Sequence, residues 1–238
     1  MSARRLDQLL SSLGYCSRSE VKHLLREERV LVDGAPARNP AQKVNPDAVR
    51  LDGEPLDHPE GLYVLFHKPL GYVCSHRDSP NIYRFFPERW LLRKPAISTV
   101  GRLDKDTSGI LLLTDDGLLL HRLTSPKYHL PRVYDVTLAE PLRGDEAQVI
   151  GSGTLMLEDD DKPCLPAQWQ PTGARVGRLT LHEGRYHQVR RMFAALGNHV
   201  SALHRSAFGP LTLGELAPGE YRDLRDDELA LLNGGHAP

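Results

Sequence analysis

A short polar stretch, Asp57-His-Pro-Glu-Gly61, divides this chain of 238 residues into two parts with different sequence patterns. Proline and glycine this close together interrupt helices and strands, and the chain length suits two unequal domains. The part before the stretch begins with helical periodicity, whereas the part after it consists of apolar runs typical of strands, with helices between them. We therefore expect a small domain over residues 1–57, a linker over 58–61 and a larger domain over 62–238.

The small N-terminal domain is predicted to contain two helices followed by short strands. Gly14 ends the first helix, whose apolar face consists of leucines at helical spacing: Leu6, Leu9, Leu10 and Leu13. Ser17 and Glu20 form a capping-box pair for the second helix, which is expected from Arg18 to about Arg29. Short apolar runs then end in dipeptides typical of hairpin turns, Asp33-Gly34 and Asp52-Gly53.

The larger domain is predicted to mix strands and helices. Strands are expected at residues 62–66, 110–114, 133–138 and 178–182, and helices at 186–196 and 224–232. The 20 glycines and 18 prolines make the chain rich in turns, which argues against an all-helical bundle. The expected fold class is α+β.

The charges of the chain nearly cancel, because 30 lysine and arginine residues face 31 aspartate and glutamate residues. This balance excludes a uniformly basic coat for nucleic acid but allows a local basic surface. No apolar run has the length of a signal-peptide core or a membrane span. The three cysteines are odd in number and far apart, which excludes a disulfide framework and a paired-cysteine zinc site. We expect a cytoplasmic protein without membrane association.

The segment with the most chemical information is a polar loop, Gly101-Arg-Leu-Asp-Lys-Asp-Thr-Ser-Gly109, that leads directly into an apolar strand. This layout presents Asp104 and Asp106 from a rigid element, which is a common setting for catalysis. A solvated turn is the simplest alternative. A calcium loop is another, since Asp104, Asp106 and Ser108 match part of its ligand spacing. However, no amphipathic helix flanks the loop, and Asp115 stands where such loops have a bidentate glutamate.

A second segment, Gly184–Gly214, contains no carboxylate. Its arginines and histidines are Arg185, His187, Arg190, Arg191, His199, His204 and Arg205. Guanidinium groups suit planar contacts to phosphate. The alternative is a solvated helix face, but the lack of counter-charges within the segment favours the binding of a polyanion.

These segments together resemble the motifs of the RsuA/RluA superfamily of RNA pseudouridine synthases. The loop Gly101–Gly109 resembles the catalytic Gly-Arg-Leu-Asp motif, Glu183–Phe193 the later basic motif, and Arg132-Val-Tyr134 the Lys-x-Tyr motif. The N-terminal domain resembles the S4 RNA-binding module, so that the resemblance covers nearly the whole chain. Two departures are His67, where the family usually has asparagine, and Arg132, where it usually has lysine.

The resemblance implies a small S4-like α/β RNA-binding domain followed by a catalytic domain built on a mixed, largely antiparallel β-sheet with flanking helices. The implied reaction is the isomerisation of a uridine to pseudouridine in ribosomal RNA. The glycosidic C–N bond is cleaved, the base turns, and it is joined again through carbon. Because this involves neither redox change nor an external group, we expect no cofactor and no metal.

The resemblance also implies roles for individual residues. Asp104 is the expected nucleophile, and Arg190 is expected within hydrogen-bond reach of it, keeping it ionised and oriented. Tyr134 is expected to stack on the flipped base and to serve in proton transfer. The expected substrate-binding residues are Arg102, Lys105, Arg185, His187, Gln188, Arg191 and Leu203. The N-terminal residues expected to bind RNA are Arg18, Lys22, Arg26 and Arg29.

Three stretches are similar to the RsuA branch of the superfamily: Gly71–Ser75, Gly184–His199 and Leu203–Arg205. This similarity favours 16S rRNA as the partner, at a uridine 516-type site and within an assembling small subunit, for a monomeric enzyme. The alternatives are a 23S rRNA pseudouridine synthase of the same family and a non-catalytic RNA-binding ribosome-assembly factor. A glycoside hydrolase using Asp104 and Asp106 is a weaker alternative, because no aromatic cluster for sugar stacking lies nearby.

Overall fold

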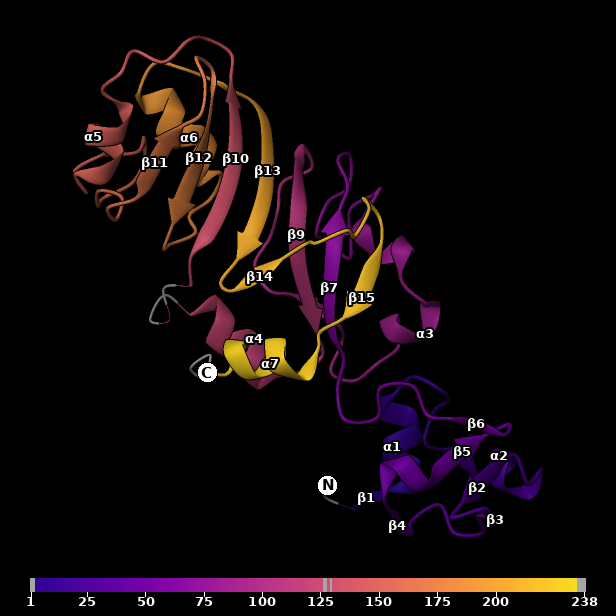
Figure 1. The fold of residues 1–238 in the computed structure, drawn as a ribbon. Coiled ribbons are helices and arrows are strands. Elements are labelled where there is room, and N and C mark those ends of the chain that lie inside the picture. Colours follow the sequence, from indigo (N-terminus) through magenta and orange to yellow (C-terminus); the bar gives the residue numbers. More distant parts are fainter. Residues whose placement is uncertain (1–2, 126–127, 129, 235–238) are drawn as a thin grey trace. The chain divides into compact units, whose positions relative to one another are not determined.

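The computed structural model describes residues 3–125, 128 and 130–234 (Figure 1). The residue contacts divide the chain into two compact units, which we call the N-terminal and the C-terminal unit. The first contains Met1–Tyr63, Tyr83–Ser98 and Leu113–Leu120, and the second contains Val64–Ile82, Thr99–Leu112 and His121–Pro238. The predicted division at residues 58–61 follows the order of the chain, whereas the contacts group two later segments with the N-terminal unit.

The first part of the N-terminal unit contains two helices and short strands around a leucine-rich core. The elements are β1 (Arg4–Arg5), α1 (Leu6–Ser12), α2 (Val21–Arg26), β2 (Val30–Val32), β3 (Ala35–Pro36), β4 (Lys43–Val44), the 3-10 helix η1 (Pro46–Ala48), β5 (Val49–Leu51) and β6 (Glu54–Pro55). Leu6, Leu9 and Leu10 of α1 are fully buried, as their spacing predicts. Both expected Asp-Gly turns are present, with φ of 51° at Asp33 and 55° at Asp52.

The second helix is shorter than predicted. Ser17 and Glu20 do form the reciprocal contacts of a capping box, since the Ser17 amide donates to Glu20 Oε2 at 2.6 Å. The chain between them forms a turn, and α2 begins only at Val21. At its other end Glu28 adopts φ of 55°, which a continuing helix does not allow. The helix therefore ends at Arg26 rather than near Arg29.

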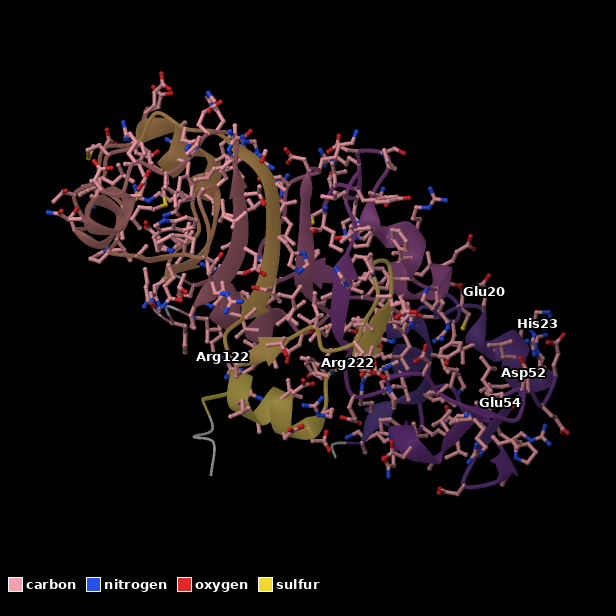
Figure 2. The ribbon with its side chains drawn as sticks, turned by 45° about the horizontal axis from the view of Figure 1, so that its top comes forward. Glu20, His23, Asp52, Glu54, Arg122 and Arg222 are labelled. Carbon is pink, nitrogen blue, oxygen red and sulfur yellow. The ribbon has the colours of Figure 1, made fainter. Side chains whose placement is uncertain are left out.

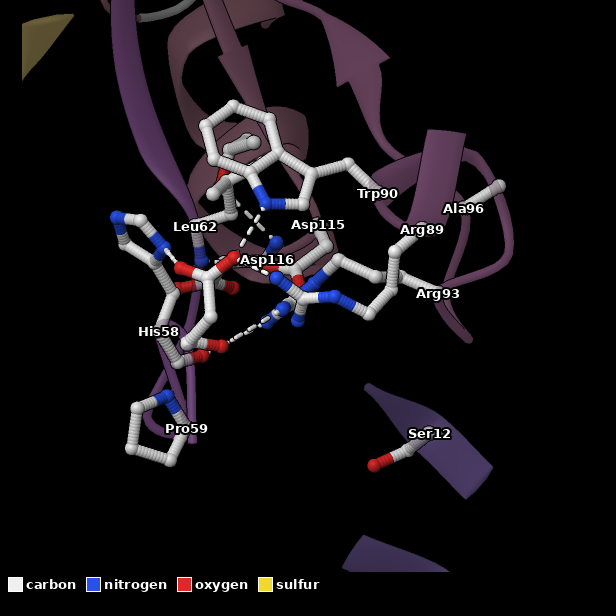
Figure 3. Close-up of polar contacts among 12 residues, drawn as sticks. Ser12, His58, Pro59, Leu62, Arg89, Trp90, Arg93, Ala96, Asp115 and Asp116 are labelled. Atoms are coloured by element: carbon white, nitrogen blue, oxygen red, sulfur yellow. Dashed lines mark hydrogen bonds and ion pairs between the residues drawn. The ribbon is translucent and has the colours of Figure 1, made fainter. Parts of the chain in front are cut away.

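A polar cluster within the N-terminal unit holds the chain at the start of the predicted linker (Figure 3). The Asp57 carboxylate accepts hydrogen bonds from Arg89 and from Trp90 Nε1. Arg93, whose side chain is 1% exposed, lies with Nε 2.6 Å from Asp115 Oδ2 and donates to the backbone oxygens of Asp57 and His58. The segment around residue 57 is thus anchored by side chains that come from residues 89–93.

The remaining elements include one nine-stranded sheet. They are β7 (Tyr63–Lys68), the 3-10 helix η2 (Ile82–Phe85), α3 (Glu88–Leu91), β8 (Ser98–Thr99), β9 (Thr107–Thr114), α4 (Gly117–Thr124), β10 (Arg132–Leu138), α5 (Glu146–Gly151), β11 (Gln168–Pro171), β12 (Val176–Leu181), α6 (Gln188–Ala195), β13 (Val200–Phe208), β14 (Leu211–Thr212), β15 (Tyr221–Asp223) and α7 (Asp226–Leu232). The strand order is β11-β12-β10-β13-β9-β7-β15, with β14 beside β13 and β8 beside β9 (Figure 1).

The sheet is mixed and largely antiparallel, as expected. β13 pairs in parallel with β9, whereas it pairs antiparallel with β10. Buried residues alternate along β10 at Tyr134, Val136 and Leu138, because successive side chains of a strand point to opposite faces. Helix α6 covers part of the sheet, and the Phe193 ring contacts Trp169 of β11 at 5.0 Å between centroids. No helix in the described part of the chain is long and apolar enough to cross a membrane.

Two elements begin at different positions from those predicted, and both differences affect the polar loop and the basic segment. β9 starts at Thr107, three residues earlier than expected, so that Thr107 and Ser108 belong to the sheet. Helix α6 starts at Gln188 instead of Tyr186, because His187 adopts the left-handed conformation with φ of 46°. His187 therefore precedes the helix and lies on a sharp turn.

Candidate active site

A cavity of about 550 Å³ in the C-terminal unit contains most of the predicted site residues. It lies between the loop before β9, the face of β10 and β13, and the start of α6. The predicted residues that line it are Arg102, Asp104, Lys105, Tyr134, Arg185, His187, Gln188, Arg190 and Leu203. Arg191 is absent from the lining.

Strand register explains how distant parts of the sequence meet at this cavity. Tyr134 of β10 is the direct cross-strand neighbour of Arg205 on β13, and Arg205 in turn is level with Gly109 on β9. Gly109 has φ of 120°, and a Cβ atom there would lie 2.2 Å from the backbone oxygen of Arg205. Only glycine allows the two strands to approach this closely, so Gly109 fixes the position of the loop that precedes β9.

Asp104 has a different neighbour from the one predicted. Its side chain is 31% exposed, and Oδ1 lies 3.3 Å from Nε2 of His187. The His187 ring stacks on Tyr186, with 3.8 Å between ring centroids. The left-handed turn at His187 is what directs its imidazole toward the loop.

The predicted ion pair between Arg190 and Asp104 is replaced by one with Asp106. Arg190 Nη2 lies 2.8 Å from Asp106 Oδ2, and the guanidinium also donates to the backbone oxygens of Asp106 and Val200. The expectation came from the family resemblance, which does not tell the two loop carboxylates apart. In the structure Asp106 is the one that contacts Arg190 of α6. Arg190 therefore positions the loop that carries Asp104.

Three of the predicted substrate-binding residues are held within the protein. Arg185 pairs with Asp160 at 2.9 Å and Glu183 at 3.1 Å, and Arg191 pairs with Asp160 at 2.7 Å. Gln188 is buried and donates to Glu183 at 2.6 Å. The sequence segment 184–214 contains no carboxylate and therefore gave no indication of these ion pairs. Folding brings the carboxylates of Asp160 and Glu183 to the arginines from outside the segment.

Among the described residues, the exposed cations at the cavity are Arg102 and Lys105, both on the loop before β9. In the N-terminal unit, Lys22 and Arg26 are exposed. Arg18 instead pairs with Asp7 at 3.1 Å. Arg29 forms a bidentate ion pair with Asp52, whose position is labelled in Figure 2. Two of the four predicted RNA-binding residues of the N-terminal unit, Arg18 and Arg29, are therefore paired with carboxylates of the protein.

Lys68 is a buried residue near the loop that the sequence analysis did not single out. Its side chain is fully buried, and Nζ donates to the backbone oxygens of Thr107 at 2.7 Å and Pro69 at 3.0 Å. Desolvation lowers the pKa of Lys68 to about 8. The sequence signal for this residue is its place at the end of the apolar run 62–66, directly before Pro69. Lysine is rarely buried, so a lysine that continues a buried strand calls for a specific role.

Two further arginines lie close to the cavity. The guanidinium carbons of Arg132 and Arg205 are 5.7 Å and 5.4 Å from the centre of the Phe208 ring. Burial lowers the pKa of Arg132. Gly184 makes room for this side chain, since a Cβ atom there would lie 3.1 Å from Arg132 Nη1. Both arginines line the cavity with Tyr134.

A second cavity, of about 690 Å³, lies along the same strands and shares Lys105 and Leu203 with the first. It contains Ser108 and His204, whose side chains are hydrogen-bonded at 2.9 Å, and it contains neither Asp104 nor Tyr134. The chemistry expected of the polar loop therefore belongs to the smaller cavity.

No group of three or more histidine, cysteine or acidic side chains in the described ranges has the arrangement of a metal site. The two loop carboxylates have separate partners: Asp104 lies beside His187, and Asp106 pairs with Arg190. The cavity thus combines the partly exposed Asp104 carboxylate with the buried Tyr134 and Leu203 and with several guanidinium groups.

Comparison with known protein families gives matches over both parts of the chain. Residues 62–195 match the family described as RNA pseudouridylate synthase, and residues 4–49 match the S4 domain. The first match contains the loop before β9, Tyr134 and Arg190.

Individual relatives are similar over nearly their full length. The ribosomal small subunit pseudouridine synthase A of Pasteurella multocida is 44% identical, over 96% of this chain and 99% of that protein. The protein of the same name from Escherichia coli K12 is 43% identical, over 95% and 98%. A solved structure described as a pseudouridylate synthase is 36% identical with a TM-score of 0.67, over 96% of this chain and 99% of that one. This chain belongs to the RNA pseudouridylate synthase family and is an RNA pseudouridine synthase with an N-terminal S4 domain.

Proposed function

We propose that this enzyme converts one uridine of 16S rRNA to pseudouridine, at the 516-type site that the motif resemblance implies. The names of the relatives from Pasteurella multocida and Escherichia coli support the small subunit as the source of the substrate. The substrate within this proposal is the RNA of an assembling small subunit, and the enzyme acts as a monomer in the cytoplasm, where ribosomes are made. The single observation that carries the catalytic part is the position of Asp104, a partly exposed carboxylate at the cavity that also contains Tyr134 and Leu203.

Asp104 is the proposed nucleophile. The overall reaction breaks the bond between C1′ of the ribose and N1 of uracil and forms a bond between C1′ and C5. C5 loses its proton to solvent, and N1 gains a proton from solvent. A carboxylate can assist by forming a transient bond to the reacting nucleotide, which makes one difficult step into two easier ones. His187 Nε2, at 3.3 Å, fixes the orientation of the Asp104 carboxylate.

Tyr134 and Leu203 are the proposed walls of the pocket for the flipped base. Both are at least 92% buried and belong to neighbouring strands, Tyr134 to β10 and Leu203 to β13. Extrusion of a nucleotide from its stack costs about a few kcal/mol, which stacking on an aromatic ring offsets in part. Tyr134 in addition has a phenol group that can accept or donate a proton next to the base.

The exposed cations Arg102 and Lys105 are the proposed phosphate contacts beside the cavity, because the loop presents both with Asp104. Lys22 and Arg26 of the N-terminal unit supply further contacts that are indifferent to sequence. Under this proposal the N-terminal residues 1–57 bind RNA and residues 62–238 carry out the reaction, joined by residues 58–61.

The test compares the wild-type enzyme with Asp104→Asn and, as a control, Asp161→Asn, which removes one exposed carboxylate elsewhere. Pseudouridine would be mapped chemically in 16S and 23S rRNA from cells that lack the protein and carry each variant. We expect one 16S site to be lost in the absence of the protein, restored by Asp161→Asn and left unmodified by Asp104→Asn, which still binds RNA. A lost site in 23S rRNA would contradict the 16S assignment, and unchanged maps of both RNAs would favour an assembly factor. Near-normal turnover by Asp104→Asn would contradict the nucleophile assignment.

A further inference from the structure

The guanidinium of Arg205 is buried at the active-site cavity with unused hydrogen-bonding capacity. The residue is 2% exposed, and its Nε donates to the backbone oxygen of Ile110 at 2.9 Å. Nη2 is enclosed and has no hydrogen-bond partner among the described residues. An enclosed donor without an acceptor costs about 1–3 kcal/mol, and more when the group is charged. A ligand in this cavity that carries an acceptor atom would satisfy the donor.

The charge of Arg205 also lacks a carboxylate among the ion pairs of residues 3–125, 128 and 130–234. Its stabilising neighbour is the ring of Phe208, whose centre lies 5.4 Å from the guanidinium carbon. Arg132 lies over the same ring at 5.7 Å, so no negative charge balances Arg205 from that side either.

The strand register places Arg205 beside the proposed pocket for the base. It is the cross-strand neighbour of Tyr134, and it lies two residues after Leu203 on the same face of β13. A ring held by Tyr134 and Leu203 would therefore present an edge to Arg205. The ribose and its phosphates belong near Asp104, which is 31% exposed, and not near a side chain at this depth.

We propose that Arg205 donates a hydrogen bond to a ring carbonyl oxygen of the target uracil and that this contact is present both before and after the base turns. The inference rests on the proposed function, because it assumes a uracil in this cavity. A half-turn of uracil about the axis through N3 and C6 exchanges N1 with C5 and O2 with O4. A donor that meets O4 of the substrate therefore meets O2 of the turned base at the same place. Arg205 acts as a specificity-determining residue that fixes the base in either orientation.

The test uses RNA that carries uridine, 2-thiouridine or 4-thiouridine at the target position, with tritium at C5 so that its release reports turnover. Sulfur accepts hydrogen bonds more weakly than oxygen. We expect the wild-type enzyme to prefer uridine in kcat/KM by about tenfold over at least one thio-substituted RNA. In Arg205→Met, kcat/KM with uridine should fall by about 10- to 100-fold, and the preference over the thio-substituted RNA should fall to about one.

Arg178→Met is the matched control, since it removes an exposed guanidinium that pairs with Asp135 outside this cavity. It should keep the wild-type preference. If Arg205→Met does not fold, as judged by circular dichroism and thermal melting, Arg205→Lys is measured, and its preference should be at least about threefold weaker than that of the wild type.

Binding measurements test the two orientations separately. In an Asp104→Asn background, adding Arg205→Met should weaken the binding of uridine RNA and of pseudouridine RNA by similar factors, within about threefold of each other. Weakening of only one of them overturns the contact in both orientations. A preference against sulfur that is unchanged in an active Arg205 variant overturns the inference as a whole, because sulfur would then be excluded by size alone. Absence of tritium release by the wild-type enzyme from every rRNA would instead overturn the proposed function, and the inference with it.

Discussion

Arg190 Nη2 lies 2.8 Å from Oδ2 of Asp106 and 3.2 Å from the backbone oxygen of the same residue. Its Nη1 donates to Val200 O at 3.0 Å, at the start of β13. One guanidinium therefore ties the loop that carries Asp104 to the strand that carries Leu203. Arg190 holds this loop at Asp106, two residues after the proposed nucleophile, and not at Asp104 itself.

Removal of these contacts should lower turnover by different amounts. Arg190→Met loses all three, and kcat should fall by about 100-fold, because a misplacement of about 1 Å at a reacting group has an effect of this size. Asp106→Asn keeps the contact to the backbone oxygen, so kcat should fall by only about three- to tenfold. Steady-state kinetics with rRNA would measure both, and KM should change little. An Arg190→Met enzyme with near-normal kcat would show that the loop needs no such support.

Asp160 is predicted to hold two arginines away from RNA. Hydrogen bonds from Arg185 and Arg191 hold the pKa of Asp160 below its usual range. Asp160→Asn should leave Arg191 without a carboxylate partner, whereas Arg185 keeps its pair with Glu183. One additional cation should tighten RNA binding by about two- to fivefold and steepen the plot of log Kd against log salt by about one unit. Filter-binding titrations at several salt concentrations would measure this. Asp161→Asn removes the same charge from an exposed neighbour, so equal effects of the two substitutions would contradict the prediction.

The ion pair between Arg93 and Asp115 is predicted to stabilise the N-terminal unit. Arg93→Met leaves the Asp115 carboxylate, which is 10% exposed, without its cation, and breaking such a pair costs about 3–5 kcal/mol of unfolding free energy. The double variant Arg93→Met/Asp115→Asn should recover part of this loss, because the amide oxygen still accepts from the Leu62 amide. Urea denaturation would measure both. A double variant that is less stable than the single one would contradict the prediction.

Lys68 should make stability depend on pH in the alkaline range. Burial lowers its pKa in the folded protein to about 8, whereas its ordinary value is 10.5. Between these values the unfolded chain binds more protons, so the free energy of unfolding should rise with pH, by up to about 3 kcal/mol in total. Lys68→Met should lack this rise. The measurement is the difference in unfolding free energy between wild type and variant from pH 7 to 10, and a constant difference would contradict the prediction.

Local sequence rules predicted the elements well. The leucines of α1, the Asp-Gly turns and the alternation along β10 each depend on neighbours in the chain, and the structure has them where they were expected. The shortened α2 and the late start of α6 depend on left-handed residues, Glu28 and His187, that propensity alone does not reveal.

Pairings between distant residues were harder to predict. Asp160 reaches Arg185 over 25 positions, and Arg190 selects Asp106 over Asp104 although the two carboxylates are only two residues apart. Such choices depend on where strands and loops lie in space. A count of charges in a sequence window is therefore a poor guide to which cations remain available for RNA.

The cluster around Asp57 has a consequence for dissecting the enzyme. A fragment that begins at residue 62 would lose the carboxylate that accepts from Arg89 and Trp90, and the backbone oxygens of Asp57 and His58 that accept from Arg93. The buried Arg93 and Trp90 would then face water or unfilled space. A catalytic fragment cut at the sequence boundary would therefore be prone to aggregation, and a practical truncation should keep residues 57–61 attached to it.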